Sequence, residues 1–304
     1  MPMIQVSVVL PVYNGAKTLS NTLDSLVVQT YTDFEVIACI DGSSDDSQGI
    51  LEQYTSKFKK LTILKNEFNR GLGPTMNRLI HHTEGEYIAI AEQDDYYYPE
   101  RLQLQVEILN KNQAIGLVSG IAEFWDGKNA HGKFPGMLVH GAQYPEGVEM
   151  FMINYKRQIK VANSCMMFRK SVHVDNGLYF TQHYPSISVD WTYILRFSLI
   201  SKIHGLHQVL VRIDRRPKRN SVTADKTKQF KATRELLRSF AYEYPDIITN
   251  KDYKYALTTQ SLLEINSQSG IAYIITWLGF FLKRPTEKRY IENLKKRISR
   301  KIKK

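Results

Sequence analysis

Short apolar runs alternate with amphipathic segments through the first hundred residues of the chain. The apolar runs are rich in β-branched residues and end on polar or glycine-rich sequence, which predicts buried strands over 6–10, 34–40, 61–64 and 87–91. The segments between them space apolar residues three or four apart, which predicts helices over 19–29, 47–57 and 74–83. Strands that alternate with helices predict an α/β fold with a mostly parallel sheet and helices on both faces.

The pattern is less regular after residue 115. It predicts strands over 116–120, 164–168 and 209–213, and helices over 146–154 and 189–199. Residues 126–143 hold several Gly and His and indicate a loop, and the polar, basic stretch 215–231 indicates a mobile segment. From residue 232 onward the pattern predicts a helical C-terminal extension.

Acidic residues crowd the end of the fourth predicted strand, where Glu92, Asp94 and Asp95 lie within four positions. Open α/β sheets bind ligands at the carboxyl ends of their strands, so the ends of strands one, two and four should line one crevice. Carboxylates this close repel one another unless a cation joins them. A Mg2+ or Mn2+ ion shared with substrate phosphates would satisfy them. The alternative is an acidic turn in which Asp95 caps a helix opened by Pro99.

Charge is unevenly distributed along the 304 residues, whose net charge is +11. Residues 1–100 hold 7 Lys and Arg against 14 Asp and Glu, a net of −7, so the remainder holds 34 against 16, a net of +18. This distribution suits a metal site in the first part and anions, such as diphosphates or an anionic membrane, in the second. Nucleic acid is the other anion, but no nucleic-acid motif is present.

Cysteine usage and the N-terminus indicate a reducing, cytoplasmic setting. Cys39 and Cys165 offer neither a disulfide framework nor a metal-binding spacing, and Cys39 is expected to be a buried thiol. The chain enters its first strand without a basic segment before it, so we expect no signal peptide.

The C-terminus joins an apolar run, 271–282, to a basic tail, 283–304, which holds eleven Lys and Arg. The run is too short for a membrane span of about 20 residues. With Trp277 and Phe280 it suits an interfacial anchor on anionic lipid, peripheral to the membrane. The alternative is a core helix followed by a solvated tail.

Five segments, in order over residues 5–222, resemble motifs of the inverting family 2 glycosyltransferases, which have the GT-A fold. The segments are Ser7–Asn14, Asp41–Asp45, Asn69–Asn77, Glu92–Leu102 and Asp190–Arg196. They are similar to the family's opening strand, its D-D-G-S-T-D motif, its N-x-G-L-x-x-x-x-N loop, its D-x-D-D with P-x-x-L, and its E-D-x-x-L-x-x-R helix.

The resemblance implies a GT-A domain over 1–225, with a nucleotide-sugar-binding half, 1–115, and an acceptor-binding half, 116–225. The helical, basic region 226–304 lies outside it. Three positions depart from the family pattern: Ile40 and Val189 replace acidic residues, and Glu92 replaces an aspartate. The stretch 212–221 also lacks the histidine that many relatives place before a serine, which puts a histidine metal ligand in doubt.

The resemblance also implies a nucleotide-sugar donor site. Asp41 would accept the N3–H of a uracil or thymine base, unless it is only a turn residue. Pro11 and Tyr13 would shape the pocket for base and ribose, with Asn14 as a further donor-binding residue; the alternative for Tyr13 is ordinary packing. Arg70 would contact donor phosphate or lie exposed.

The implied chemistry rests on two aspartates. Asp94 would contact the donor and be the main metal ligand, with Glu92 and Asp95 beside it. Asp190 would be the general base that activates an acceptor hydroxyl; its alternative is a helix-terminal aspartate near the positive end of a helix dipole. Trp191 would stack on the acceptor sugar or, more simply, pack in the core.

A basic group follows the last predicted strand of the domain: Arg215, Arg216, Lys218 and Arg219. These side chains would close over the diphosphate as a lid or form a solvated loop. We therefore expect an inverting hexosyltransferase that moves a sugar from a UDP-sugar to a hydroxyl of a glycan acceptor, lipid-linked, in cell-surface polysaccharide biosynthesis on the cytoplasmic face of the membrane.

Two alternatives compete with this expectation. A nucleotidyltransferase would need a basic, glycine-rich loop after the first strand, where the chain has Pro11–Gly15. A non-catalytic carbohydrate- or nucleotide-binding partner subunit with the same fold would explain Ile40 and Val189, but the retained Asp94 and Asp190 oppose it.

Overall fold

The computed structural model describes residues 4–158, 161–181, 188–216 and 226–302. The chain divides into two compact units. The first comprises Met1–Phe151 and Ile159–Ala224, and the second comprises Met152–Gln158 and Asp225–Lys304.

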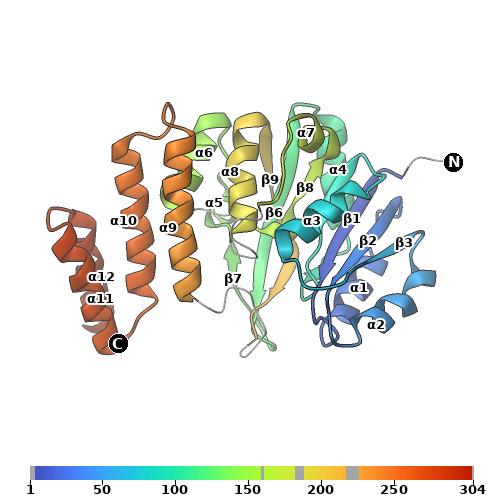
Figure 1. Ribbon diagram of the computed structural model, residues 1–304, viewed down its shortest axis with the longest axis horizontal. Helices are drawn as coiled ribbons and strands as arrows, with labels where there is room; N and C mark the ends of the chain where they lie inside the picture. The colour runs from blue at the N-terminus through green and yellow to red at the C-terminus, as the bar shows by residue number, and fades with distance from the viewer. Residues whose placement is uncertain (1–3, 159–160, 182–187, 217–225, 303–304) are drawn as a thin grey trace. The chain divides into compact units, whose positions relative to one another are not determined.

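The first hundred residues form the predicted parallel sheet (Figure 1). Its strands are β1 (Val6–Val12), β2 (Phe34–Asp41), β3 (Leu61–Asn66) and β4 (Tyr87–Ile90), in the order β3-β2-β1-β4. All three pairings are parallel. The carboxyl ends of β1, β2 and β4 therefore meet at one edge, as the sequence pattern predicted.

Helices cover both faces of this sheet because alternate residues of each strand point to opposite sides. One core joins the face of Val8 to α1 (Leu19–Val27), α2 (Ser47–Gln53) and α4 (Arg101–Lys111). The other joins the face of Val9 to α3 (Leu72–His81) and α8 (Val189–Ile200). A 3-10 turn, η1 (Thr55–Lys57), follows α2. Cys39 and Cys165 are both free and buried.

The rest of the first unit turns the parallel sheet into a mixed one. The described residues hold nine strands, in the order β3-β2-β1-β4-β8-β6-β9-β5, with β7 on β6. The later strands are β5 (Tyr96–Tyr97), β6 (Ile115–Trp125), β7 (Ala130–Phe134), β8 (Met167–Arg169) and β9 (Lys202–Asp214). Strand β8 runs antiparallel to β4 and β6, whereas β6 and β9 pair in parallel, so the sheet is mixed beyond its first four strands. The sheet flanked by helices otherwise confirms the expected GT-A architecture.

Two local predictions were wrong. The expected loop 126–143 contains β7 and the short helix α5 (Gly136–Val139). Strand β7 is almost wholly exposed and pairs with β6, so it carries no apolar signal of its own. The expected strand 164–168 begins as a 3-10 turn, η2 (Asn163–Cys165), before β8. Helix α7 (Lys170–Asp175) also belongs to the first unit, whereas α6 (Gly147–Arg157) begins in the first unit and ends in the second.

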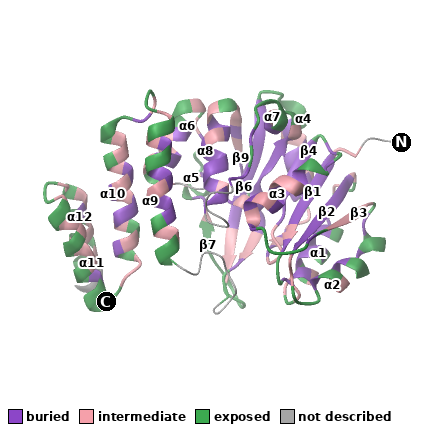
Figure 2. Cartoon of the chain, in the orientation of Figure 1, coloured by how far each residue is buried: buried purple, intermediate pink, exposed green. Residues whose placement is uncertain are grey.

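The second unit is helical, as predicted. Its helices are α9 (Lys226–Glu243), α10 (Asn250–Asn266), α11 (Gly270–Lys283) and α12 (Lys288–Ile302). A small core of Ile265, Tyr273 and Tyr290 joins α10, α11 and α12, and α11 and α12 are otherwise largely exposed (Figure 2). Of the stretch predicted to be mobile, 215–231, residues 217–225 lie outside the described residues. Residues 226–231 form the first turns of α9, so the prediction was wrong there. No helix in the described ranges has both the length and the apolarity that a membrane crossing requires.

Candidate active site

The loops that follow β1 and β2 are joined by hydrogen bonds through Asn14. Its backbone N–H donates to Ser43 Oγ at 3.0 Å, and its Oδ1 accepts from the Ser44 N–H at 2.9 Å. Asn14 has a φ of 49°, in the left-handed region that asparagine tolerates better than most residues. Asn14 therefore fixes the edge of the crevice, and its amide is engaged within the protein.

The loop after β4 is joined to the end of β1 by a second pair of hydrogen bonds. The Tyr13 N–H donates to Gln93 Oε1 at 2.8 Å, and Gln93 Nε2 donates to the Tyr13 carbonyl at 2.9 Å. A Cβ on Gly15 would lie 2.4 Å from Gln93 Oε1, so a larger residue there would displace the Gln93 amide. The Tyr13 side chain is 46% exposed, so it is not ordinary core packing.

Asp41 at the end of β2 organises the loop that precedes α3. Its Oδ1 accepts from the Arg70 N–H at 2.8 Å and from Asn66 Nδ2 at 2.7 Å, and its Oδ2 accepts from the Gly71 N–H at 3.0 Å. Asp41 is buried, whereas the Arg70 side chain is exposed and Pro11 is half-buried. The carboxylate thus has a structural function whether or not it also contacts a base.

The acidic residues after β4 differ in their surroundings. Glu92 Oε1 accepts from Asn163 Nδ2 at 2.7 Å. Asp95 is buried, and its Oδ2 accepts from Ser164 Oγ. Its Oδ1 is also buried and accepts no hydrogen bond from the residues that the structure describes. Asp95 does not cap α4, which begins at Arg101, has Glu100 as its N-cap residue and lacks a side-chain cap. That alternative was wrong because Asp95 points into the protein.

The carboxyl groups at this edge raise one another's pKa. Burial, and then the negative charge of Asp94, raise the pKa of Glu92 to about 7, and Asp190 adds to this rise. Burial, Glu92 and Asp94 raise the pKa of Asp95 well above its ordinary range. Negative charge is therefore crowded where β4 ends, and Asp190, from the start of α8, lies close enough to contribute.

Basic residues at the end of β9 lie against the same carboxylates. The Arg215 guanidinium lowers the pKa of Glu92, by less than Asp94 and Asp190 raise it. Arg216 pairs with Asp214 at 2.6 Å, and that pair, with a smaller contribution from Asp94, raises the Arg216 pKa. The structure thus brings Glu92, Asp94, Asp190 and these two arginines together. Lys218 and Arg219 lie outside the described residues.

The carboxylates at the end of β4 are suitable ligands for a divalent cation that takes its other ligands from outside the protein. Mg2+ is usually bound through one or two carboxylates, with substrate phosphates and water as its other ligands. Glu92 and Asp94 offer such carboxylates, and the unpartnered Oδ1 of Asp95 adds buried negative charge nearby. Across the described residues, however, no three His, Cys, Asp or Glu side chains are grouped as a ready metal site. A cation here would need ligands from its substrate.

Asp190 is half-buried in the first turn of α8, after Ser188, whose φ of 55° is left-handed. Trp191 beside it is only 1% exposed, so it packs in the core rather than on an acceptor sugar. Helix α3 reaches the chain just before this region. Asn77 Nδ2 donates to the Phe180 carbonyl at 2.9 Å, and the Phe180 N–H donates to Asn77 Oδ1 at 2.8 Å.

Four residues that support the site were not predicted: Gln93, Asn163, Ser164 and Asn77. Gln93 and Asn77 stand inside motifs that the sequence displays, so their positions were visible but not their contacts. Asn163 and Ser164 lie about seventy positions from the carboxylates they contact, and no local pattern marks them.

Comparisons with known proteins identify relatives of this chain. The family model "Glycosyl transferase family 2" matches residues 7–174. EpsE of Bacillus subtilis (strain 168), named as a glycosyltransferase, is 28% identical over 184 residues, which cover 58% of this chain and 66% of EpsE. The Escherichia coli protein WfgD is 27% identical over 241 residues, which cover 77% of this chain and 86% of WfgD. Its name describes a UDP-Glc:alpha-D-GlcNAc-diphosphoundecaprenol beta-1,3-glucosyltransferase.

The fold is similar to that of TarS 1–349 from S. aureus in its complex with UDP-GlcNAc. The TM-score is 0.67 at 20% sequence identity, and the match covers 95% of this chain and 79% of TarS 1–349. The family model matches more than half of the chain, and the arrangement of strands and helices is similar to that of TarS 1–349. The chain therefore belongs to glycosyl transferase family 2 and has the GT-A fold.

Proposed function

We propose that this protein is an inverting glycosyltransferase that moves a sugar from a UDP-sugar to a hydroxyl group of a lipid-linked glycan in cell-surface polysaccharide synthesis. The observation that carries the proposal is the proximity of Asp190 to the acidic end of β4. A base and a cation-binding group at one edge of the sheet are what this transfer requires. The donor and acceptor in the name of WfgD support the same classes of substrate for this chain.

The donor half, 1–115, would hold the nucleotide at the ends of β1 and β2. Asp41 would accept the uracil N3–H, because a carboxylate has about four lone-pair positions and three are used. The exposed Tyr13, with Pro11 and Asn14, would border the base and ribose. Arg70 has an exposed side chain next to the loop that Asp41 fixes, which suits contact with donor phosphate.

Asp94 and Glu92 would hold Mg2+ or Mn2+, with Asp95 behind them. A divalent cation bound there neutralises the charge that develops on the nucleoside diphosphate as it leaves. Arg215 and Arg216 at the end of β9 would add positive charge on the same side.

Asp190, in the acceptor half, would act as the general base. Its carboxylate would take the proton of the acceptor hydroxyl as that oxygen bonds to the anomeric carbon. The bond from that carbon to the diphosphate oxygen breaks on the opposite face. Attack and departure on opposite faces invert the anomeric centre, as in inverting glycosidases.

The experiment is titration calorimetry of UDP, with GDP and CDP for comparison, with and without Mn2+. We expect UDP binding that needs Mn2+ and is lost in Asp94→Ala but kept in Asp46→Ala, which removes an exposed carboxylate. Absence of nucleoside-diphosphate binding in the intact protein would overturn the donor site and favour a non-catalytic partner subunit.

The C-terminal helices support a peripheral location on the cytoplasmic face of the membrane. Five side chains of α11 form one apolar stripe and are 42–76% exposed: Ile271, Ile274, Ile275, Leu278 and Leu282. This stripe beside the basic α12 suits an anionic lipid surface. The aromatic residues expected at that surface face inward instead. Trp277 Nε1 donates to the Tyr290 carbonyl at 2.9 Å, and Phe280 packs on the small core.

A further inference from the structure

A cavity of about 350 Å³ lies among helices α9, α10, α11 and α12 of the second unit. Four cationic side chains line it, and Glu235 is its acidic lining residue. The four cations are Arg234, Arg238, Lys283 and Arg284. Phe280 and two tyrosines form less polar parts of the wall. We call this cavity the basic pocket.

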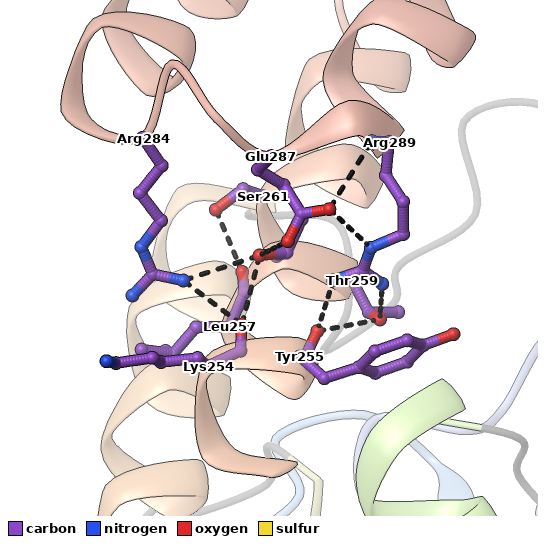
Figure 3. Close-up of polar contacts among 9 residues, drawn as sticks. Lys254, Tyr255, Leu257, Thr259, Ser261, Arg284, Glu287 and Arg289 are labelled. Carbon is purple, nitrogen blue, oxygen red and sulfur yellow. Dashed lines mark hydrogen bonds and ion pairs between the residues drawn. The ribbon is translucent and has the colours of Figure 1, made fainter. Parts of the chain in front are cut away.

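Two of the cations are held in place by the protein. Arg234 pairs with Glu264, and its guanidinium lies 5.3 Å from the centre of the Phe280 ring. Arg284 donates from Nη1 to the Lys254 carbonyl at 3.0 Å and to Thr258 Oγ1 at 3.3 Å (Figure 3). These contacts fix the walls of the basic pocket before any ligand enters.

The other two cations are available to a ligand. Arg238 and Lys283 are exposed, and neither forms an ion pair with a carboxylate in the described ranges. Two neighbouring acidic side chains are already engaged, Glu264 with Arg234 and Glu287 with Arg289 at 3.2 Å, and the lining residue Glu235 offsets one of the remaining positive charges. The basic pocket therefore keeps an excess of positive charge that an anion would neutralise.

The size and chemistry of the basic pocket select a phosphate group. Ligand pockets for whole small molecules occupy about 300–1,000 Å³, so this one is at the small end and suits a head group rather than a nucleotide-sugar. Arg presents a planar fork of donors that matches phosphate oxygens, and Lys adds a point charge.

The position of the basic pocket indicates what carries that phosphate. Lys283 and Arg284 stand at the C-terminal end of α11, directly after Leu282, which is 73% exposed in the apolar stripe. We propose that the basic pocket binds the phosphate head group of an anionic lipid while the α11 stripe contacts the acyl region. This inference rests on the membrane location proposed above, but not on the donor site.

The test uses the full chain and a matched pair of double variants. Arg238→Gln with Lys283→Gln removes the two available cations of the basic pocket. Lys231→Gln with Lys251→Gln removes the same charge from exposed positions that neither line it nor belong to α11 or α12. Inorganic pyrophosphate is titrated calorimetrically in EDTA, so that a metal-dependent donor site does not contribute. Sedimentation is then measured with phosphatidylcholine vesicles that contain phosphatidic acid or phosphatidylserine at equal surface charge.

We expect the affinity for pyrophosphate to fall roughly tenfold or more in the pocket variant, because each charge-assisted hydrogen bond contributes substantially to binding. In the control variant the affinity should change little. We also expect stronger sedimentation with phosphatidic acid, whose phosphate is a monoester, and loss of that preference in the pocket variant alone. Equal losses in both variants would reduce the effect to general charge and overturn the proposal.

Pyrophosphate binding without any preference between the two lipids would assign the basic pocket to a soluble phosphate compound and overturn its lipid part. Absence of pyrophosphate binding in the intact protein would overturn the site itself. Mn2+-dependent UDP binding, measured on the same samples, reports on the donor site separately, so either proposal can fail without the other.

Discussion

Gln93 and Tyr13 exchange two backbone-directed hydrogen bonds, of 2.8 and 2.9 Å, across 80 positions of sequence. The bonds join the end of β4, where the carboxylates stand, to the end of β1, where the exposed Tyr13 ring stands. One neutral amide thus fixes the spacing between the proposed metal ligands and the proposed nucleotide pocket.

Replacing Gln93 with Leu should weaken donor binding without unfolding the protein. The change removes both hydrogen bonds, each of about 1 kcal/mol, so we expect the KM for the UDP-sugar to rise by up to roughly thirtyfold. Steady-state kinetics with varied donor would measure it. Gln103→Leu, which removes a half-buried hydrogen bond to Glu107 on α4, is the control. An unchanged donor KM in Gln93→Leu would show that the spacing does not matter for binding.

Replacing Asp190 with Asn should remove turnover and leave donor binding intact. General base catalysis typically contributes about 10²–10⁴-fold, so kcat should fall by that range. Single-turnover kinetics and UDP calorimetry on the same sample would separate the two effects. Asp175→Asn, at the exposed end of α7, should behave as the parent. Near-parent turnover in Asp190→Asn would exclude Asp190 as the base.

Glu92 makes stability depend on pH when no metal is bound. Its pKa rises from an ordinary 4.5 to about 7, chiefly through burial and then through Asp94. The folded protein therefore holds a proton that the unfolded chain has lost in that interval. This stabilising contribution is complete below pH 4.5 and is lost as the pH rises through about 7.

The measurement is urea unfolding in EDTA at several pH values for the parent and Glu92→Gln. The difference in unfolding free energy, parent minus variant, should decrease as the pH rises, most steeply between pH 4.5 and 7, and should level off above 7. Metal affinity should increase over the same interval, because the ligand must be ionised. A difference that does not vary with pH would contradict the assignment.

Replacing Asp41 with Asn should destabilise the first unit. An amide presents N–H groups to the Gly71 or Arg70 N–H, which both donate to the carboxylate in the native protein. Leaving such a buried donor unsatisfied costs about 1–3 kcal/mol. Chemical unfolding would measure the loss, with the exposed Asp46→Asn for comparison. Equal stabilities would mean that the loop before α3 does not depend on Asp41.

Charging the apolar stripe should release the protein from anionic vesicles. Ile271→Lys with Ile275→Lys would place two ammonium groups where we expect acyl chains, and sedimentation with the vesicles should fall strongly. Val28→Lys with Val174→Lys adds the same charge at exposed apolar positions outside the C-terminal helices, where Val28 and Val174 are 54% and 57% exposed. If the first pair sedimented as fully as the second, the stripe would not be the contact.

Much of the first unit could be predicted because its strands are buried on both faces and carry a continuous apolar signal. The limits of β1, β2 and β4 agree with the sequence pattern to within two residues. By contrast, β5 is two residues long, and β7 is exposed, so both depend on their partner strands. Pairing of that kind is a tertiary property that no local pattern contains.

The candidate site likewise combines features that the sequence shows with features that depend on the fold. Acidic residues at a strand end are visible in the sequence, but the positions of Asn163 and Ser164 beside them depend on how distant segments fold back. The inward-facing Asp95 illustrates the limit. Its place in the motif suggested a helix cap, whereas its burial and its bond from Ser164 depend on the neighbouring chain.

The contact between Asn77 and Phe180 limits where segments of this protein can be exchanged with those of a relative to make a chimaera. A Cβ on Gly73 would lie 2.1 Å from the Thr181 carbonyl oxygen, so α3 and the chain at 180–181 fit each other closely. A chimaera that exchanges acceptor halves at residue 115 would take α3 from one parent and residue 180 from the other. Exchanges that carry both segments from one parent keep the hydrogen-bonded pair and the close fit, and so preserve the approach to Asp190.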